Sequence, residues 1–372
     1  MKIVWYTTRN FGDMCATTPV EISKRLVERG HELTIINPDK AEDHQDMGWF
    51  HRSVWQEKFT PGFRARKIAS SMKKSITNDS PKADIFLVDW AILPYMIKTL
   101  NGSNTPTIMI DRSPPAYSNL FAKLQWYIWR KSWKLILKGK IESGCVVSNT
   151  HKKFVNEKLG IPADKIFVLN AGVDSELFFP MDEISTGPLK FVYHGQMDKN
   201  RGIFVLPFFI QNLINNGIDA ELTLIGDGNI GSQLRRMKKE CPWMNILDSI
   251  PYSDIPALLR IHDIGLLPMP NRGIWPLASP LKRGEYLASG LLVFGVNHSG
   301  HSLDFIDSRF YKLSNQENFH AEGLEWVRTL TQEKRAKGRR EVRAAAKKYL
   351  PWDKTVDVLE EAMHNALRNN SN

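Results

Sequence analysis

The stretch "SGCVVSNTHKKFVNEKLGIPADKIFVLNAG", residues 143–172, contains a short apolar run, an amphipathic segment and a second apolar run. Apolar runs of this length joined by a helical pattern are typical of strand–helix–strand units in parallel sheets. Gly160 follows the last predicted turn of the helix, a position where glycine commonly ends helices. The stretch therefore predicts one βαβ unit of a parallel sheet.

The same alternation continues in both directions along the chain. Strand-like runs before it include "KIVWYTT" at residues 2–8 and "ADIFLVDW" at 83–90, and helical patterns follow them. A second series of the same kind begins after "DEISTGP", residues 182–188, whose polar composition is that of a linker. We therefore expect an α/β protein with two Rossmann-like domains, residues 1–183 and 187–350, that face each other across a ligand-binding cleft.

Charge and cysteine content restrict the partners and the compartment. The 372 residues include 50 Lys and Arg against 40 Asp and Glu, a net charge of +10 that favours phosphate-rich ligands, acidic lipids or nucleic acid. Cys15, Cys145 and Cys241 lie far apart and form no C-x-x-C pair, which argues against a disulfide framework or a zinc site. The sequence shows neither a signal peptide nor an apolar run of about 18 residues, so we expect a cytoplasmic protein, soluble or peripheral on a membrane.

The segment "LIGDGNIG", residues 224–231, has the G-x-G-x-x-G spacing of dinucleotide-binding turns. It follows the second predicted strand of its domain, whereas such fingerprints normally follow the first. Two interpretations stay open. The segment is either a dinucleotide site or a glycine-rich turn into a helix whose N-terminus can face a phosphate.

The segment "SPLKRGEYLASG" begins at Ser279 and carries more specific signals. Ser279 and Pro280 read as an N-cap and a first-turn proline, which predicts a helix over residues 281–288. Lys282 in the first turn is unfavourable with the helix dipole unless an anion binds there. Glu285, one turn later, can accept two hydrogen bonds from a vicinal diol such as a ribose. An exposed ion pair between Lys282 and Glu285 is the alternative interpretation.

The segment "FVYHGQMDKNRGI", which begins at Phe191, reads as a strand, a turn and a helix start with Lys199 and Arg201. Two cationic helix starts in one gap fit a diphosphate, and Arg201 can bind it in a bidentate manner. His194 at the strand end could reach a bound donor, although a lone histidine there is more often structural.

Several stretches, taken in order, make the whole chain similar to the GT-B glycosyltransferases of family 4, retaining enzymes that use nucleotide-diphosphate sugars. These stretches are "RLVERGHELTII", "GIPADKIFVLNAGVDSELFFP", "YHGQMDKNRGI", "LTLIGDG", "SDIPALLRIHDIGLLP" and "SPLKRGEYLASGLLVFG". Their combination is specific, although each piece alone is not. The resemblance implies that the final helix, residues 352–369, packs back on the first domain after Pro351.

The resemblance also implies roles for individual residues. Arg201 and Lys282 would hold the diphosphate, and Glu285 would bind the ribose. The turn from Ile250 to Tyr252 would flank the base, and the loop at Gly12 would approach the phosphates from the first domain. UDP or GDP is the expected nucleotide, with no metal and no further cofactor. The expected donor-binding residues are Gly12, Gly195, Arg201, Gly226, Ile250, Tyr252, Ser279, Leu281, Lys282 and Glu285.

Three positions depart from the family pattern. Leu277 stands where the first glutamate of the E-x7-E pattern is usual, and Gln196 replaces the arginine that follows the glycine of the phosphate turn. Asp111-Arg112 stands where many relatives carry His-Asp. We expect the catalytic groups among Asp111, Arg112 and His194, with an N-terminal cap of residues 113–120 as the alternative role of Asp111.

The segment "LQWYIWRKSWKLILKGK", residues 124–140, predicts a basic amphipathic helix without an acidic residue. Leu124, Ile128 and Leu135 are its expected core positions. Its three tryptophans extend beyond one core stripe, which is typical of helices on anionic lipid, and residues 62–75 add a second basic patch. A core helix with solvated lysines stays open as an alternative, and no nucleic-acid module accompanies the patch. The predicted membrane contacts are Trp126, Trp129, Arg130, Trp133 and Lys134.

Together these features predict a glycosyltransferase that moves a sugar from a nucleotide-diphosphate sugar to a lipid or lipid-linked acceptor. We expect it at the inner face of the cell membrane, on an anionic surface, with retention of configuration. Transfer to a soluble acceptor stays open. So does a non-catalytic nucleotide-sugar or nucleic-acid binding protein, which Leu277 and the net charge suggest.

Overall fold

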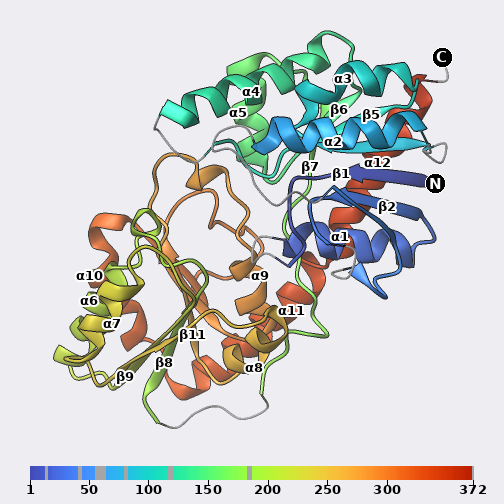
Figure 1. Ribbon diagram of the computed structural model, residues 1–372. Helices are drawn as coiled ribbons and strands as arrows, with labels where there is room; N and C mark the ends of the chain where they lie inside the picture. The colour runs from blue at the N-terminus through green and yellow to red at the C-terminus, as the bar shows by residue number, and fades with distance from the viewer. Residues whose placement is uncertain are drawn as a thin grey trace. The chain divides into compact units, whose positions relative to one another are not determined.

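The computed structural model describes residues 1–12, 16–40, 44–54, 64–78, 83–115, 120–181 and 187–370. The chain divides into two compact units, each built on its own sheet (Figure 1). The first unit comprises Met1–Asn170 and Trp352–Asn372, and the second comprises Ala171–Pro351.

In the described residues of the first unit, seven parallel strands follow the order β3-β2-β1-β4-β5-β6-β7. The strands are β1 (Lys2–Tyr6), β2 (Glu32–Asn37), β3 (Phe50–Ser53), β4 (Ile85–Asp89), β5 (Thr107–Ile110), β6 (Ser143–Val146) and β7 (Ile166–Val168). The helices are α1 (Thr17–Glu28), α2 (Arg64–Asn78), α3 (Leu93–Gly102), α4 (Leu120–Leu137), α5 (Asn149–Leu159) and α12 (Trp352–Asn370).

In the described residues of the second unit, six parallel strands follow the order β10-β9-β8-β11-β12-β13. The strands are β8 (Leu189–His194), β9 (Ala220–Ile225), β10 (Met244–Leu247), β11 (Ile264–Leu267), β12 (Leu292–Val296) and β13 (Tyr311–Ser314). The helices are α6 (Val205–Asn215), α7 (Gly231–Lys238), α8 (Ile255–Leu259), α9 (Leu281–Ala288), α10 (Phe319–Arg328) and α11 (Gln332–Tyr349). The predicted α/β class with two Rossmann-like domains is confirmed.

Each sheet reverses its strand order beside its first strand. β1 lies between β2 and β4, and β8 lies between β9 and β11. Ligands of such sheets bind outside the carboxyl ends of the strands at this switch point. The topology alone therefore indicates one candidate site in each unit.

The βαβ motif predicted over residues 143–172 folds as expected. β6, α5 and β7 follow one another, the hydroxyl of Ser148 accepts the His151 N–H at 3.0 Å, and Gly160 ends α5 with φ +67°. The helix predicted over residues 281–288 is α9, with the same bounds. Its predicted cap is wrong, because Pro280 occupies the N-cap position and no side chain caps the helix.

The chain passes from the first unit to the second at Asn170, earlier than the polar segment at 182–188 suggested. Val173 forms a β-bridge with Pro351, and Phe178 is fully buried in the core of the second unit. The Arg343 guanidinium donates to the carbonyl oxygens of Ser175 (2.7 Å) and Phe178. Apolar burial and these hydrogen bonds tie the segment before the polar stretch to the second unit.

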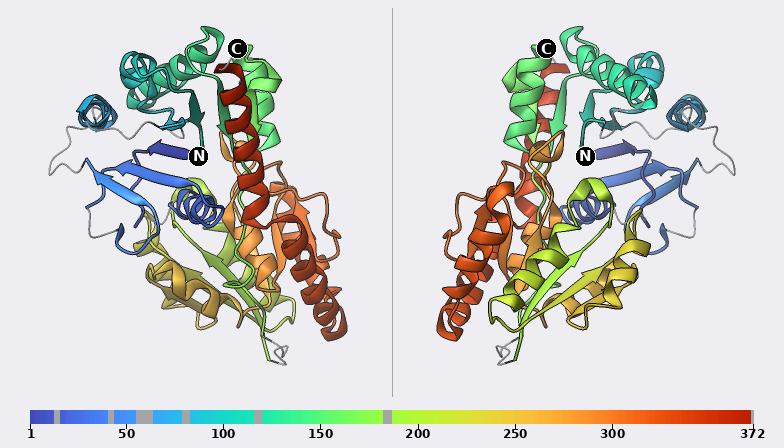
Figure 2. Two further views of the ribbon diagram at one scale, coloured as in Figure 1. Left: turned by 90° about the vertical axis from the view of Figure 1, so that its right-hand side faces the viewer. Right: turned by 90° about the vertical axis from the view of Figure 1, so that its left-hand side faces the viewer.

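The C-terminal helix α12 belongs to the first unit and packs against α1 and β7. Arg29 binds three carboxylates of α12, those of Asp353 (3.0 Å), Asp357 (2.8 Å) and Glu360 (2.6 Å). Figure 2 shows α12, at the red end of the colour range, beside the helices of this unit. The last segment of the chain thus completes the first unit.

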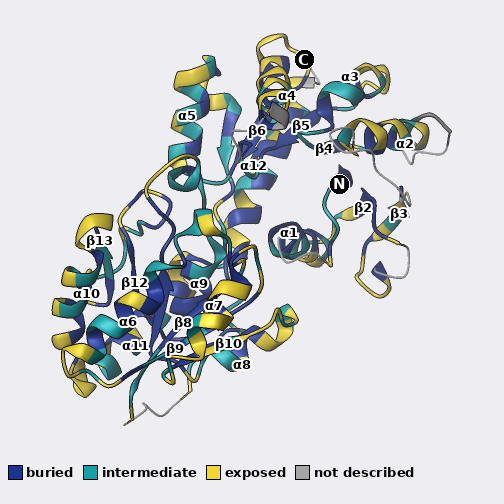
Figure 3. Cartoon of the chain, turned by 60° about the vertical axis from the view of Figure 1, so that its left-hand side comes forward, coloured by how far each residue is buried: buried dark blue, intermediate teal, exposed yellow. Residues whose placement is uncertain are grey.

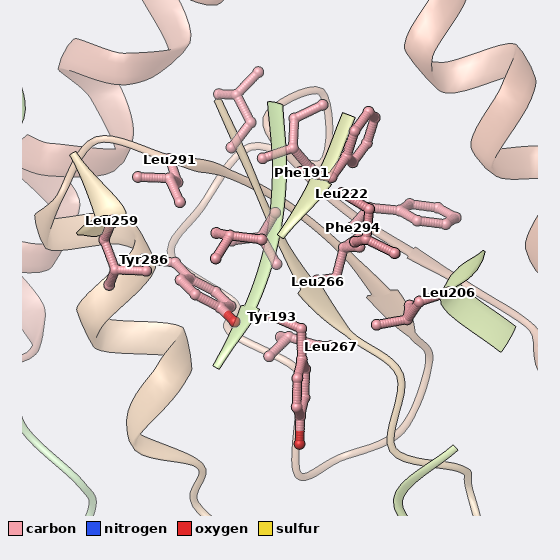
Figure 4. Close-up of a cluster of buried hydrophobic side chains, with 14 of the residues drawn as sticks. Phe191, Tyr193, Leu206, Leu222, Leu259, Leu266, Leu267, Tyr286, Leu291 and Phe294 are labelled. Carbon is pink, nitrogen blue, oxygen red and sulfur yellow. The ribbon is translucent and has the colours of Figure 1, made fainter. Parts of the chain in front are cut away.

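The core of the second unit fixes the strand ends that carry its candidate site. Phe191, Leu222 and Phe294 are fully buried between the sheet and its helices. Figure 4 shows Tyr193 beyond them, with its hydroxyl pointing away from Phe191 and Leu222. Tyr193 is itself 1% exposed, so its ring is a rigid base for the residues around it.

Candidate functional site

Two glycine turns at the carboxyl ends of β8 and β9 pack into one another. The Gly195 N–H donates to the Ile225 carbonyl and the Met197 N–H to the Asp227 carbonyl, each at 2.8 Å. Gly226 has φ +135°, and a Cβ there would lie 2.2 Å from the carbonyl oxygen of Gly195. The glycines of residues 224–231 are therefore explained by this close approach, which supports a turn rather than a dinucleotide fingerprint.

Lys282 lies directly against the first of these turns. A Cβ at Gly195, whose φ is +118°, would lie 2.7 Å from the Lys282 Nζ. The same Nζ lies 5.2 Å from the ring centroid of Tyr193, over the ring. The helix α9 thus places a cation from its first turn beside the turn that follows β8. A cation at a strand end can bind a phosphate by a charge-assisted hydrogen bond.

Arg201 lies at the end of the short 3₁₀ helix Lys199–Arg201 and is held from two sides. Its Nη2 donates to the Gln196 Oε1 at 3.1 Å, and its guanidinium lies 5.1 Å from the ring centroid of Trp275. The Tyr193 hydroxyl donates to the Gln196 carbonyl at 2.9 Å. Gln196 stands at a position where the family usually has an arginine, and here it orients the side chain of Arg201.

Tyr193 is the common neighbour of both predicted phosphate-binding cations. Burial raises the pKa of its hydroxyl, and the charge of Arg201 lowers it only in part. Because Lys282 lies over its ring, the two cations occur around one buried side chain. The structure thus brings Arg201 and Lys282 together within the second unit.

His194 and Glu285 form a buried pair beside this turn. The His194 Nε2 lies 3.1 Å from the Glu285 Oε2, and the two residues are 8% and 2% exposed. Burial lowers the pKa of His194, and the attraction of Glu285 raises it only in part. The alternative of an exposed Lys282–Glu285 pair is therefore wrong, because Glu285 points inward to His194. A role for His194 in catalysis and for Glu285 in ribose binding stays a prediction.

Ser279 and Tyr252 are engaged in contacts within the second unit. The Ser279 hydroxyl accepts the Ala171 N–H at 3.1 Å and an Arg283 N–H at 2.9 Å. The Tyr252 ring packs on the buried Phe178, with ring centroids 5.7 Å apart. These contacts hold the two positions in place, while their donor roles stay predictions.

The remaining predicted donor positions and the departure at Leu277 lie in different surroundings. Ile250 and Leu281 are partly buried, and Leu277 is buried at the end of the 3₁₀ helix Trp275–Leu277. Gly12 in the first unit is exposed next to Phe11, whose N–H donates to the Asp39 carboxylate at 2.8 Å. Their roles in donor binding stay predictions as well.

A pocket of about 450 Å³ opens at the switch point of the first unit. One part of its lining is polar and carries Asp89 at the end of β4 together with three arginines. The other part is apolar and reaches Leu124 of α4, which is 48% exposed. The polar lining is Thr8, Arg9, Arg64, Asp89, Arg112, Ser113 and Gln125, and the apolar lining includes Trp90, Tyr95, Ile110, Pro114, Leu124 and Ile128.

Asp89 is fixed by the loop after β1. Its Oδ2 accepts the Thr7 hydroxyl at 2.7 Å and the Thr8 N–H at 3.1 Å. Burial raises the pKa of Asp89, and these hydrogen bonds and the charges of Arg9 and Arg112 lower it only in part. A carboxylate held in this way at a pocket wall can accept a hydrogen bond from a substrate hydroxyl.

Asp111 and Arg112, both predicted as catalytic, have different surroundings at the end of β5. Arg112 lines the pocket and donates from Nη2 to the Thr18 hydroxyl at 3.1 Å. Asp111 is 1% exposed, and its Oδ2 accepts the indole N–H groups of Trp129 (2.6 Å) and Trp133 (2.8 Å). Asp111 is thus a buried structural acceptor, and its assignment as a substrate-contacting residue is wrong.

The same hydrogen bonds correct the membrane prediction for α4. Trp129 and Trp133 are 1% and 0% exposed, because a buried indole N–H needs an acceptor and Asp111 provides it. Leu124, expected in the core, is exposed instead. The prediction that Trp129 and Trp133 contact lipid is therefore wrong.

Three of the predicted membrane contacts remain accessible. Trp126 is half-buried, and Arg130 and Lys134 are exposed. The outer sides of α2 and α4 carry exposed residues (Figure 3). Contact of these residues with lipid stays a prediction.

Sequence reasoning missed several residues of the first-unit pocket, Asp89 and Arg9 above all. The available signal was an aspartate directly after the buried run "IFLV" at residues 85–88. That signal points to a site only once β4 is known to lie beside β1, and strand order cannot be read from the run itself.

The described part of the chain lacks two kinds of feature. It contains no group of three or more His, Cys, Asp or Glu side chains that could hold a metal ion. None of its helices is long and apolar enough to span a bilayer.

Two Rossmann-like units define an α/β protein of a fold whose ligands bind outside the carboxyl ends of the strands. A family model, Glycosyltransferase Family 4, matches residues 16–177. This match covers less than half of the chain and makes that part similar to the family 4 glycosyltransferases, and the whole chain shares the GT-B fold. No curated protein sequence matches the chain.

Solved structures of the same fold cover nearly the whole chain. A glycosyltransferase from Rickettsia africae is 18% identical, with a TM-score of 0.72 and 99% of each chain covered. Alr3699/HepE from Anabaena, solved in complex with UDP, is 12% identical with a TM-score of 0.72, and 98% of this chain and 100% of that one are covered. Sucrose-phosphate synthase from Thermosynechococcus elongatus is 12% identical with a TM-score of 0.75, and 99% of both chains is covered.

Proposed function

We propose that this protein transfers a sugar from UDP-sugar or GDP-sugar to a lipid or lipid-linked acceptor at the inner face of the cell membrane, with retention of configuration. The observation that carries the acceptor proposal is the first-unit pocket. Asp89 and the arginines offer its polar part to a hydroxyl and an anionic group, whereas its apolar part continues to the exposed Leu124. This mixed polar and apolar lining fits an acceptor with a polar head and an apolar tail.

The donor is assigned to the second unit. Lys282 and Arg201 surround Tyr193, and the turn at Gly195 lies beside Lys282. In the reaction the bond from the anomeric carbon to the phosphate oxygen breaks, and one further negative charge develops on the departing diphosphate. Preorganised cations stabilise that charge by a few kcal/mol for each well-placed donor. The same proposal includes no metal and no further cofactor.

The acceptor is activated by position. Asp89 accepts the hydrogen bond of the acceptor hydroxyl and so directs its oxygen lone pair to the anomeric carbon. As the new carbon–oxygen bond forms, the hydroxyl proton passes to the departing phosphate oxygen. Retention is carried over from the family resemblance. Support for a UDP donor comes from the UDP bound by the Anabaena neighbour.

A second candidate function is transfer to a soluble phosphorylated sugar. Arg9, Arg64 and Arg112 in one pocket also fit a phosphate group. The structural likeness to a sucrose-phosphate synthase adds weight to this alternative. The two candidates differ in whether the apolar part of the pocket is used.

The test is a transfer assay with UDP-, GDP- and ADP-sugars and two acceptor classes. One class is a polyprenyl-linked saccharide in detergent, and the other is a set of soluble sugars and sugar phosphates. We expect transfer to the lipid-linked acceptor, unchanged by EDTA, and loss of that transfer in Leu124→Asp. Transfer to soluble sugar phosphates alone would establish the second candidate. Nucleotide binding without transfer to any acceptor would refute both.

A further inference from the structure

A groove between α4 and α5 lies apart from the pocket at the switch point. Its volume is about 650 Å³, and its lining includes Lys123, Trp126, Trp129, Arg130, Phe154 and Lys158. We call this set the α4–α5 groove. It shares no lining residue with the pocket that contains Asp89.

Three aromatic rings form the apolar part of the α4–α5 groove. The ring centroids of Trp126 and Trp129 are 5.3 Å apart, and those of Trp129 and Phe154 are 5.8 Å apart. Trp126 and Phe154 also meet edge to face at 6.4 Å. Trp129 is buried, and the hydrogen bond from its indole N–H to Asp111 holds its ring in place. Trp126 and Phe154 remain partly exposed.

Three exposed cations surround these rings, namely Lys123, Arg130 and Lys158. The Arg130 guanidinium lies 5.7 Å from the Trp126 ring centroid, over the ring. The lining residues include no acid, and the nearby Glu157 carboxylate pairs with the Lys153 Nζ at 3.8 Å. The α4–α5 groove therefore presents a net charge of three over an aromatic floor.

We propose that the α4–α5 groove binds the phosphate of an anionic phospholipid headgroup and so docks the protein on the membrane. The cations match the phosphate in charge, and Trp126 and Phe154 match the glycerol and upper acyl region, the depth at which tryptophan is enriched. Leu124 and Tyr127, both exposed on the same helix, extend the apolar contact. This inference rests on the proposed membrane location and names the surface that provides it.

The chain offers a matched control for a general basic face. Lys131 and Lys134 on the same helix and Lys138 directly after it are exposed but do not line the groove. The triple variant Lys123→Ala/Arg130→Ala/Lys158→Ala and the triple variant Lys131→Ala/Lys134→Ala/Lys138→Ala remove the same charge. All six side chains are exposed, so both variants are expected to fold, which a thermal melt checks.

The experiment is flotation of the full chain with phosphatidylcholine vesicles, with and without phosphatidylglycerol. We expect wild-type protein to float only with phosphatidylglycerol, the groove variant to bind at least tenfold more weakly, and the control variant to lose less than threefold. Trp126→Ala, with all charges kept, is expected to lose severalfold. Equal losses of vesicle binding in the two triple variants would contradict the proposal and indicate that the whole basic face of the helix binds the membrane. Wild-type binding to RNA but not to vesicles would overturn the lipid assignment.

Transfer measured in detergent separates this proposal from the proposed function. With a detergent-solubilised acceptor, the groove variant should turn over like wild type, because the α4–α5 groove shares no residue with the Asp89 pocket. Flotation lost with transfer intact supports the groove. Wild-type flotation without transfer to any acceptor would refute the proposed function while leaving the groove supported.

Discussion

The switch points of the two sheets share one topology but differ in what surrounds the strand ends. At β8, two glycine turns interlock so closely that a Cβ at Gly226 would meet the Gly195 carbonyl at 2.2 Å, and Lys282 lies against the turn. At β1 and β4, the strand ends border a pocket of about 450 Å³ with Asp89 in its wall. The first arrangement presents cations to a compact anion, and the second leaves room for a larger molecule.

Strand order therefore selects the place of a site, whereas turn chemistry selects its ligand. Both units carry arginines, so charge alone does not separate a donor from an acceptor site. Glycine at positive φ, which admits close approach of the ligand to backbone, occurs at the strand end of the second unit. A carboxylate held by Thr7 and Thr8 occurs at the strand end of the first.

The largest effect is expected for Asp89→Asn. The amide keeps the shape of the side chain but removes the charge that orients the acceptor hydroxyl, so kcat should fall about 10² to 10⁴-fold. Binding of the nucleotide, measured by calorimetry, should stay within about twofold of wild type. Asp84→Asn, at an exposed aspartate just before β4, is the matched control and should leave kcat unchanged. A large loss of nucleotide affinity in Asp89→Asn would remove the distinction between the two sites.

Asp111→Ala sharpens the comparison between two aspartates at neighbouring strand ends. It leaves the indole N–H groups of Trp129 and Trp133 buried without their acceptor, which should cost about 2–5 kcal/mol in the free energy of unfolding. Urea unfolding measures this loss. At a temperature where the variant stays folded, kcat should remain within about threefold of wild type. A loss of kcat as large as that of Asp89→Asn, in a folded protein, would restore Asp111 to the active site.

Lys282→Ala tests the second unit in the same way. Loss of one charge-assisted hydrogen bond of about 1.5–3 kcal/mol should weaken nucleotide-diphosphate binding roughly 10 to 150-fold. Lys337→Ala, at an exposed lysine of α11 in the same unit, is the matched control. Titration calorimetry with UDP, GDP and ADP gives the dissociation constants. Equal affinities in the two variants would contradict the placement of the diphosphate.

A smaller effect is expected from pH. Burial raises the pKa of Asp89, so its carboxylate should protonate at a higher pH than an ordinary aspartate. The ionised form is the stronger hydrogen-bond acceptor, and kcat/KM should therefore fall as pH is lowered through that raised pKa, by up to about tenfold per pH unit. The pH profile of Asp89→Asn, at its lower level, should lack this limb. An unchanged limb in the variant would assign it to another group.

The sequence carried much of the second-unit site and little of the first. Gly195, Arg201 and Lys282 stand in segments with their own local signals, a glycine after a strand and a cation in a first turn, and the helix at residues 281–288 was predicted with its observed bounds. Asp89 gives no such signal, because its site exists only through the pairing of β4 with β1. Local periodicity indicates strands but not which strands are neighbours.

The tryptophans of α4 also show that a local pattern does not reveal tertiary contacts. Helical spacing places Trp126, Trp129 and Trp133 on one arc, but the acceptor that buries two of them, Asp111, comes from a different element. One missing tertiary contact therefore produced two errors, a lipid-facing role for the indoles and a catalytic role for the carboxylate.

The most direct test of the division between the two units is a crystal structure of the protein soaked with UDP or GDP. We predict the diphosphate at the end of β8, with phosphate oxygens within hydrogen-bond distance of the Lys282 Nζ and the Arg201 guanidinium. A diphosphate bound instead to Arg9 and Arg112 in the pocket of the first unit would contradict this account.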